Sequence, residues 1–416
     1  MELKKYKLAD IGKVITGKTP STSIAENYAC GTIPFYTPED VAKGLGMMGR
    51  NSRFISKTGF EEIASNTISG ESVLVGCIGS DMGNVAYSNI TCATNQQINA
   101  ITQFKNGIEP LYVYYLLSTM KSYFQKIAGS TTTPILPKSV FEEIEIHLPD
   151  MKKQKNVVSI LYAFDRKIEL NRQINDNLEA MAKQLYDYWF VQFDFPNEEG
   201  KPYKSSGGVM VWNEKLKREI PQGWYAENIC KIANILSGGT PSKSIDEYWN
   251  NGTIPFFGPT DCNGSVFQIK TADHITQKGL EHCASSLFEE GIVIITARGS
   301  IGKLVIVGTP MAMNQSCYAL QSKEGEYEYL YFLTTQLIDC LKAKGSGSVF
   351  KSIIASDIEH STLCVAAENV VSDFCKKVKP LFEKLKANTI EIAELTKQRD
   401  ELLPLLMNGQ AVVNSD

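Results

Sequence analysis

Apolar residues near the C-terminal end of the chain recur at alternating steps of three and four positions. The series consists of Val371, Phe374, Val378, Leu381, Leu385, Asn388, Ile392, Leu395, Arg399 and Leu402. Such a heptad spacing gathers one stripe of side chains along one side of an α-helix. Asn388 and Arg399 are polar interruptions that can fix the register with a partner helix. Pro380 lies inside the series and predicts a kink or a restart of the helix.

A second, less regular apolar series lies near the middle of the chain. Its members are Val157, Leu161, Phe164 and Ile168, followed, after a shift of phase near Leu170 and Asn171, by Ile174, Leu178, Met181, Leu185 and Tyr188. A shift of this kind is typical of a coiled-coil stutter. The tripeptide Val-Val-Ser opens both series, at Val157 and at Val370, so the two predicted helices are related.

Each predicted helix must bury its apolar stripe, and two related helices in one chain can bury their stripes against each other. We therefore predict a central antiparallel pair whose seam consists of Leu161, Phe164, Ile168, Leu178, Leu185, Val378, Leu385, Asn388, Ile392, Leu395 and Leu402. The alternative is that each helix packs only on its neighbouring globular domain. With a rise of about 1.5 Å per residue, a first helix of about 35 residues would be roughly 50 Å long.

Outside these helices the chain repeats itself, at an offset of 221 residues in the first two segments and with small slips in register after them. The repeated segments are GKTPS at 17–21 and GGTPS at 238–242, GTIPF at 31–35 and 252–256, VLV at 73–75 and VII at 293–295, and YVYYL at 112–116 and YLYFL at 329–333. A repeat of this extent indicates a duplicated domain. Short β-branched runs broken by Gly, Asn and Pro predict strands and turns, and aromatic-rich segments near 111–127 and 327–343 predict helices.

The predicted fold class is therefore mixed α/β, with two related globular domains and two long helices in a pseudo-twofold arrangement. The predicted divisions are a first domain at 1–149, a first helix at 150–192, a linker at 193–226, a second domain at 227–364, a second helix at 365–410 and a tail at 411–416. The linker is assigned from its Pro, Gly and Ser content.

Composition and charge narrow the class of protein. With 43% hydrophobic and 21% charged residues the chain is typical of a globular domain, and we expect no signal peptide, no membrane span and a cytoplasmic location. Ten cysteines lack any Cys-x-x-Cys pair, and the nearest metal-like group, His274 with His282 and Cys283, lacks a second ligand pair. The net charge of −4 argues against a nucleic-acid-binding protein that acts alone.

Several segments carry a resemblance to a known family. They are Leu148-Pro149 and Gln154, ILYAFDRKIELN at 160–171, LEAMA at 178–182, YWFVQFDF at 188–195, KREIPQGW at 217–224 and RDELLPLLMNG at 399–409. In this order, and over essentially the whole chain, they resemble the specificity (S) subunit of type I restriction-modification systems.

The resemblance implies that each α/β domain is a target-recognition domain that reads one half of a bipartite, asymmetric site in double-stranded DNA. It implies that the helices set the spacing and dock methyltransferase (M) subunits, two of them if both similar faces are used, with restriction (R) subunits in the full complex. S-adenosylmethionine, ATP and Mg²⁺ would act in those partners, and this chain would bind no cofactor. Half-site centres on the order of one DNA turn apart are expected.

Two glycine-rich turns are candidate DNA contacts because glycine lets a backbone approach a ligand closely. One is 79–83, which contains Ser80, and the other is 298–303, which contains Arg298, Ser300 and Lys303. Arginine is the commonest reader of guanine edges, so the second turn is the better candidate. A tight structural hairpin is the alternative for both.

Other candidates are polar residues that recur in both copies. The amides Asn95, Gln96, Gln97, Asn314 and Gln315 can pair with adenine, and Lys18, Thr19, Ser21, Thr240, Ser242 and Lys243 lie in the repeated TPS segments. Domains that read different sequences should differ where they touch bases, so recurrence favours a structural role for the amides. We expect base readers where the copies diverge, such as 43–60 and 262–280.

The segment GKVITGKT at 12–19 satisfies the Walker A pattern. A phosphate loop needs a buried strand before it and a helix that opens at the Lys-Thr, whereas Pro20 follows at once, so we predict a structural turn. The chain has no Asn-Pro-Pro-aromatic, Gly-x-Gly-x-x-Gly or His-Glu-x-x-His motif, which favours a non-catalytic subunit. The alternatives are a DNA-modifying enzyme with its own active site and a helical scaffold that binds no DNA.

Overall fold

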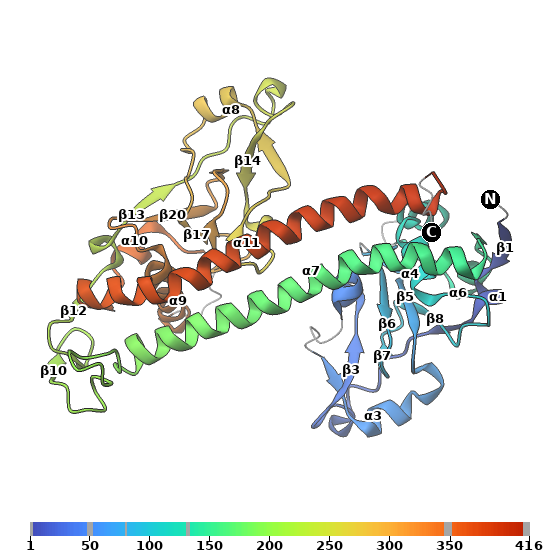
Figure 1. The fold of residues 1–416 in the computed structure, drawn as a ribbon, viewed down its shortest axis with the longest axis horizontal. Helices are drawn as coiled ribbons and strands as arrows, with labels where there is room; N and C mark the ends of the chain where they lie inside the picture. The colour runs from blue at the N-terminus through green and yellow to red at the C-terminus, as the bar shows by residue number, and fades with distance from the viewer. Residues whose placement is uncertain (1–2, 48–52, 80, 130–133, 345–351, 411–416) are drawn as a thin grey trace. The chain divides into compact units, whose positions relative to one another are not determined.

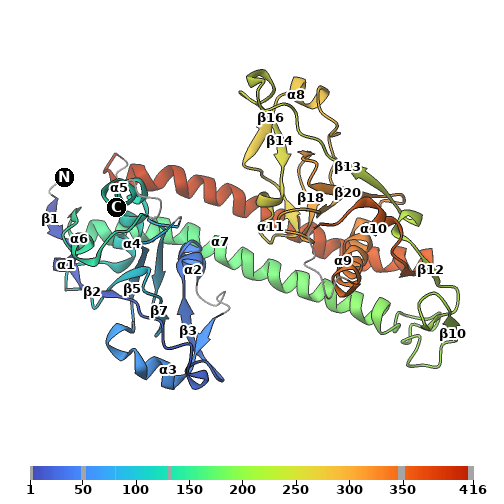
Figure 2. The same cartoon turned by 180° about the vertical axis from the view of Figure 1, so that it is seen from behind.

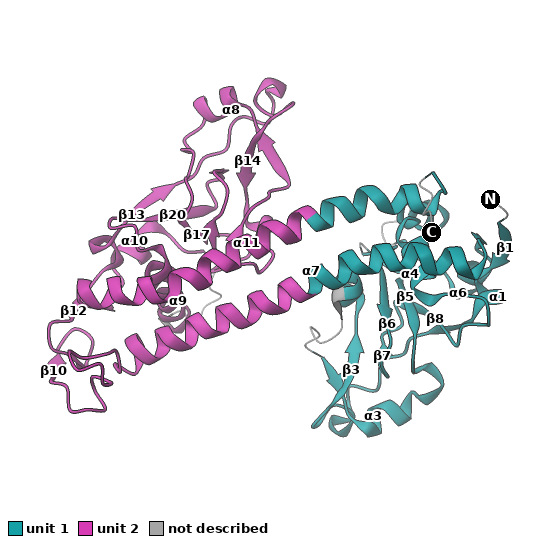
Figure 3. Ribbon diagram, in the orientation of Figure 1, with its two compact units in different colours: residues 1–169, 395–416 teal, residues 170–394 magenta. Residues whose placement is uncertain are grey.

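The computed structural model describes residues 3–47, 53–79, 81–129, 134–344 and 352–410. The chain forms two compact units, one made of 1–169 with 395–416 and the other of 170–394 (Figure 3). Both divisions fall inside a long helix, so each helix contributes residues to both units. Two mixed α/β domains and two long helices were predicted, and this fold class is confirmed.

A four-stranded antiparallel sheet is the centre of the first unit. Its order is β2 (Lys13–Thr16), β8 (Ile98–Thr102), β5 (Ser72–Gly76) and β6 (Val85–Ser88). Alternate side chains of a strand point to opposite faces, so Val73 and Val75 join one core while Leu74 joins another. Helix α4 (Pro110–Ser118) contributes to the first of these cores, which also receives residues from the long helices (Figures 1 and 2).

The other face of this sheet carries the segments that form the candidate site. A three-stranded sheet in the order β4 (Phe54–Ile55), β3 (Ile33–Tyr36) and β7 (Ala93–Thr94) contributes Tyr36, and α2 (Pro38–Val41) contributes Val41, to the core beside Leu74. Further helices of this unit are α1 (Leu8–Ile11), α3 (Lys57–Glu62), α5 (Lys121–Ile127) and α6 (Lys138–Glu142).

The second unit repeats this plan with one added strand. Its larger sheet has the order β13 (Ala233–Ser237), β20 (Cys317–Ser322), β17 (Val293–Thr296), β18 (Leu304–Val307) and β15 (Phe267–Gln268). Its smaller sheet has the order β16 (Asp273–Ile275), β14 (Ile254–Phe257) and β19 (Ala312–Met313). The helices are α8 (Gln277–Glu281), α9 (Tyr327–Lys344) and α10 (Ala355–Glu359). In the first unit β3 pairs in parallel with β7, and in the second unit β14 pairs in parallel with β19.

Each globular domain is closed by a strand pair next to a long helix. In the first unit β1 (Lys4–Lys7) pairs with β9 (Glu145–Leu148), and α7 (Met151–Tyr186) follows. In the second unit β12 (Tyr225–Glu227) pairs with β21 (Leu363–Val365), and α11 (Glu368–Met407) follows. The duplication therefore includes the strand pair that connects each domain to its long helix.

The segment 193–226, expected to be a linker, is folded. It contains an antiparallel hairpin of β10 (Met210–Asn213) and β11 (Arg218–Pro221). Phe195 stacks on both Tyr203 and Trp224, with ring centroids 4.6 and 5.2 Å apart. A π-helical turn at Asp187–Val191 ends α7 and places Trp189 and Phe190 in the same core. Aromatic burial outweighs the turn-forming composition here.

The two long helices are antiparallel where they meet within each unit. In the second unit Asn171 Nδ2 donates to Glu391 Oε2 at 2.8 Å, and Asn388 Nδ2 donates to Asn175 Oδ1 at 2.9 Å. In the first unit Arg399 Nη1 donates to Asp165 Oδ1 at 2.6 Å. Helix α11 continues through Pro380, so the predicted restart at this residue is wrong.

Only part of the predicted apolar seam lies between the two long helices. Leu161 lies in the core of the first domain, while Val378 and Leu385 lie in the core of the second, with Leu178 and Leu185 packed against it. Of the other seam positions, Ile168 and Asn388 are buried and Phe164, Ile392, Leu395 and Leu402 are half-buried. The alternative reading, in which each helix packs on its own domain, therefore holds for the first turns of both helices.

Candidate nucleic-acid interface

The repeated TPS segments and the repeated amide turns pack directly against each other in both domains. A side-chain carbon added at Gly17 would collide with the backbone oxygen of Asn95, and one added at Gly238 would collide with that of Asn314. Only glycine permits this approach. The close contact explains why a glycine stands at the same position of both copies.

Hydrogen bonds also join the TPS segment to the amide turn in each domain, and these two segments together form a frame that both domains share. Thr19 Oγ1 donates to Gln96 Oε1 at 2.9 Å, and Thr240 Oγ1 donates to Gln315 Oε1. Beside these, Ser21 and Ser23 are joined by a 2.8 Å hydroxyl–hydroxyl bond, and so are Ser242 and Ser244. These recurring polar side chains have local partners, which agrees with the structural role that their recurrence predicts.

The asparagine of each amide turn holds its own loop. Asn95 Oδ1 accepts from the backbone N–H of Gln97 at 3.1 Å, and Asn314 Oδ1 accepts from that of Ser316 at 2.9 Å. The backbone N–H of Asn95 also donates to the carbonyl oxygen of Tyr36. The turn is thereby tied to the end of β3, where the chain enters α2.

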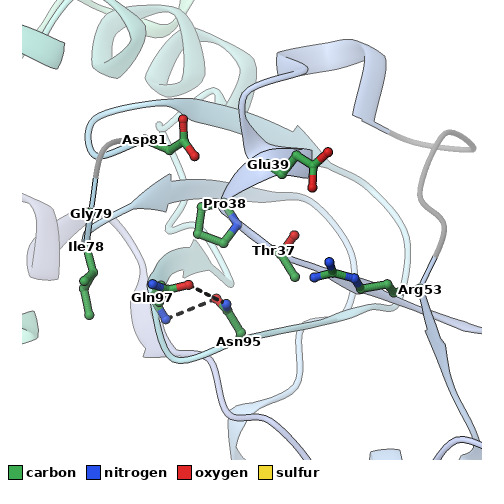
Figure 4. Close-up of a pocket in the computed structure, with 9 residues that line it drawn as sticks. All are labelled: Thr37, Pro38, Glu39, Arg53, Ile78, Gly79, Asp81, Asn95 and Gln97. Atoms are coloured by element: carbon green, nitrogen blue, oxygen red, sulfur yellow. Dashed lines mark hydrogen bonds between the residues drawn. The ribbon is translucent and has the colours of Figure 1, made fainter. Parts of the chain in front are cut away.

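A pocket of about 270 Å³ lies at this junction in the first domain (Figure 4). Its lining residues come from the start of α2, the position just before β4, the turn after β5 and the amide turn: Thr37, Pro38, Glu39, Arg53, Ile78, Gly79, Asp81, Asn95 and Gln97. Thr37 is fixed because its backbone N–H and its hydroxyl both donate to Asp40 Oδ2 at 3.0 Å. Asp40 is itself buried and pairs with Lys43 at 3.0 Å.

The charged groups of the pocket lie on separate walls. The guanidinium of Arg53 extends toward Thr37, while Glu39 stands at the start of α2 and Asp81 on the turn after β5 (Figure 4). Beneath the turn, burial raises the pKa of Cys77 to about 12, so this thiol stays protonated. Asn99 Nδ2 donates to its sulfur at 3.2 Å. The site presents hydrogen-bonding groups and no thiolate nucleophile at Cys77.

Of the other predicted residues of the first domain, Asn95 and Gln97 line the pocket, while Gln96 turns to Thr19 and Lys18 is exposed on the adjacent loop. Ser80 lies outside the described residues. The Walker A segment is not a phosphate loop, because its middle is strand β2 and no helix opens at Thr19.

In the second domain the glycine turn carries the expected cation. Arg298 is exposed, and its backbone N–H donates to the Ser316 carbonyl oxygen at 3.2 Å. Lys303 Nζ lies 3.4 Å from the carbonyl oxygen of Cys262, and the Thr296 hydroxyl donates to the carbonyl oxygen of Ser300. Lys243 lies over the ring of Trp249, 5.6 Å from its centroid, away from this turn on the TPS loop.

The three charged residues of the first pocket, Arg53, Glu39 and Asp81, were not among the candidate residues, although Asp81 lies in the glycine-rich turn 79–83 that was a candidate. Arg53 lies inside the divergent stretch 43–60 that was expected to contain base readers, so the sequence indicated the region but not the residue. Its position in the pocket follows from the pairing of β3 with β4, where Phe35 N–H donates to the Arg53 carbonyl oxygen at 3.0 Å. That pairing cannot be read from composition or periodicity.

The fold and its site define a duplicated recognition protein, in which one frame occurs twice with different polar side chains around it. The sequence model of the type I restriction modification DNA specificity domain matches residues 1–180 and 221–365. The chain therefore belongs to the DNA specificity subunits of type I restriction-modification enzymes.

Individual relatives agree with this membership. The type I restriction enzyme MjaIX specificity subunit of Methanocaldococcus jannaschii is 30% identical over 97% of this chain and 92% of its own length. The HindI specificity subunit of Haemophilus influenzae is 25% identical, covering 73% of this chain and 78% of the relative. The crystal structure of an S subunit from M. genitalium shares the fold, with a TM-score of 0.57 at 16% identity, over 98% of this chain and 96% of that one.

The described residues lack two other features. None of their helices combines the length and apolar character needed to cross a bilayer. No three His, Cys, Asp or Glu side chains among them gather as metal ligands, and the ring of His282 stacks on Tyr248.

Proposed function

We propose that the two domains of this chain read two different half-sites of one bipartite, asymmetric DNA sequence, and that the chain itself is non-catalytic. The observation that supports this is the frame shared by both domains, Gly17 with Asn95 and Gly238 with Asn314, surrounded by unlike polar residues. A common frame with different walls is what two readers of different sequences require.

We propose further that α7 and α11 dock two methyltransferase subunits. Apolar side chains on the outer surface of α7 support this, since Leu170 and Met181 are 50% and 56% exposed. Exposed apolar side chains of this kind are suited to a protein interface. The methyltransferase, together with restriction subunits in the full complex, would supply the sites for S-adenosylmethionine, ATP and Mg²⁺.

The charge of the chain supports a DNA complex that needs these partners. A net charge of −4 gives the chain no overall attraction for phosphates, whose neutralisation dominates DNA affinity. Methyltransferase subunits that enclose the duplex would supply the missing cations. The chain would then contribute sequence preference, while its partners contribute most of the affinity.

Footprinting of the chain together with its methyltransferase tests this function. We expect two short protected segments separated by an unprotected gap, and methylated adenines at the same motif in the genome. A complex that protects no defined sequence would favour a scaffold, and methyl transfer by the chain alone would favour an enzyme. As a docking control, Leu170→Lys should weaken capture of the methyltransferase, whereas Lys397→Glu, an exposed change on α11, should leave that capture nearly unchanged.

A further inference from the structure

Backbone pairing identifies which residues of the two domains occupy equivalent walls. Phe54 lies opposite Pro34, and His274 lies opposite Pro255, so the residue before each, Arg53 or Asp273, holds the same place. Cys77 N–H donates to the Gln97 carbonyl oxygen at 2.8 Å, as Ala297 N–H does to that of Ser316. The following residues, Ile78 and Arg298, are therefore equivalent as well.

The two domains thus place their arginine on different walls of one frame. The strand wall is the position of Arg53 and Asp273, at the strand that pairs with β3 or β14, and the turn wall is the position of Ile78 and Arg298, on the turn after β5 or β17. The first domain has Arg53 on the strand wall and Ile78 on the turn wall. The second has Asp273 on the strand wall and Arg298 on the turn wall. At the start of α2 the first domain has Glu39 where the repeat places Thr260 in the second.

The composition of the first pocket distinguishes a base edge from a phosphate. Glu39 and Asp81 outnumber the arginine, so a phosphate group would meet two like charges there. The major-groove edge of a G·C pair carries no net charge and presents guanine acceptors beside a cytosine amino donor. A guanidinium and carboxylates on separate walls match that edge.

The amide in the pocket makes adenine a poorer match. Asn95 Nδ2 donates to Gln97 Oε1 at 2.9 Å, which occupies one of the two lone pairs of the oxygen that a bidentate contact with adenine requires. Gln97 retains its amide N–H groups as donors toward an acceptor. Arg53 and Gln97 are then both donors, in keeping with the two acceptors of guanine, O6 and N7.

We propose that the first pocket receives the major-groove edge of a G·C base pair of one half-site, with Arg53 as the guanine reader, and that Arg298 has this role on the turn wall of the second domain. The carboxylates of Glu39 and Asp81 are the acceptors available for the cytosine amino group. This assignment rests on the proposed DNA-reading function. It makes the wall positions, and not the recurring frame residues, the determinants of sequence preference.

The test uses the full chain in complex with its methyltransferase and a library of randomised duplexes. The wild-type complex first defines the bipartite motif. Arg53→Ala should then lower the preference at one G·C position of one half-site by about 5- to 150-fold and leave the other half-site unchanged. Arg53→Lys, which keeps the positive charge but not the planar guanidinium that can donate two parallel hydrogen bonds, should lose the same preference. Lys57→Ala, an exposed neighbour, is the control that should affect all sequences alike.

A duplex with 7-deazaguanine at the affected position identifies the atom that is read. It should weaken the wild-type complex and have no further effect on Arg53→Ala. If Arg53→Ala weakens every sequence equally and reduces the dependence on salt, Arg53 contacts phosphate and the assignment is wrong, while the DNA-reading function stands. A wild-type complex with no sequence preference would overturn both.

Discussion

At the scale of single residues, recurrence in both copies separates the residues of the structural frame from the residues that we propose to read DNA bases. Gly17 and Gly238 recur because a side chain there would collide with the next loop, and Thr19 and Thr240 recur because each bonds a glutamine. These constraints do not depend on which DNA is bound. Arg53 and Arg298, by contrast, do not recur, because the equivalent positions of the other copy hold Asp273 and Ile78.

Arg298 gives the most direct prediction for the second domain. In the complex with the methyltransferase, Arg298→Ala should weaken specific binding by about 1–3 kcal/mol at physiological salt, because a bidentate contact with guanine is lost. Competition between cognate duplexes and duplexes altered in one half-site measures the effect. Lys278→Ala, whose side chain is exposed and paired with Glu247, is the matched control. Unchanged affinity in Arg298→Ala would refute the role.

The frame itself is tested by Gly17→Ala. The added methyl group must displace the loop at Asn95, so we expect the free energy of unfolding to fall by about 1–3 kcal/mol. Urea denaturation measures this loss. Lys18→Ala, an exposed change at the next position, should alter stability by less than about 0.5 kcal/mol. Equal stability of the two variants would contradict the close contact.

At the scale of elements, periodicity predicted both long helices but not all of their partners. Met181 and Tyr188 belong to the apolar series, yet both are exposed. Helix α7 packs on one domain core at its start and on another near its end, so its buried face changes along its length. A single stripe cannot describe such a helix. The π-helical turn at Asp187–Val191 adds a further change of phase.

The polar interruptions of the heptad pattern were informative about register. Asn388 meets Asn175, and Arg399 meets Asp165, which is buried and also accepts from the Tyr115 hydroxyl at 2.6 Å. Although burial acts in the opposite direction, the charge and hydrogen bond of Asp165 raise the pKa of Arg399. The partners themselves could not be predicted, because they depend on which turn of one helix faces which turn of the other.

The Asp165–Arg399 pair yields a prediction about stability. Arg399→Met would leave Asp165 buried with Tyr115 as its remaining side-chain partner among the described residues, so the free energy of unfolding should fall by about 3 kcal/mol. The equivalent part of the second unit is apolar, with Tyr186, Phe332 and Val378 in one core. The triple variant Tyr115→Phe, Asp165→Val, Arg399→Tyr copies that arrangement and should approach wild-type stability. Denaturant midpoints measure both, and a triple variant no better than the single one would refute the comparison.

At the scale of the whole molecule, acidity and DNA reading are reconciled by a division of labour. Specific contacts with base edges need only a few side chains, such as Arg53 and Arg298, whereas affinity needs many phosphate contacts. A chain with a net charge of −4 can supply the first and leave the second to partners. Sequence composition alone indicated this need for a partner, but it could not indicate where the readers lie.

This division predicts how binding depends on salt. The logarithm of affinity falls against the logarithm of salt concentration with a slope of about −0.9 for each phosphate contact. The chain alone should therefore show weak binding and a shallow slope between about 50 and 200 mM salt, and the methyltransferase complex a slope steeper by several contacts. Fluorescence anisotropy with cognate and unrelated duplexes measures both slopes. Arg53→Ala in the complex should change the difference between the duplexes much more than the slope. If the chain alone bound DNA as tightly and with as steep a slope as the complex, its own surface would have to supply the phosphate contacts, and the division of labour would be wrong.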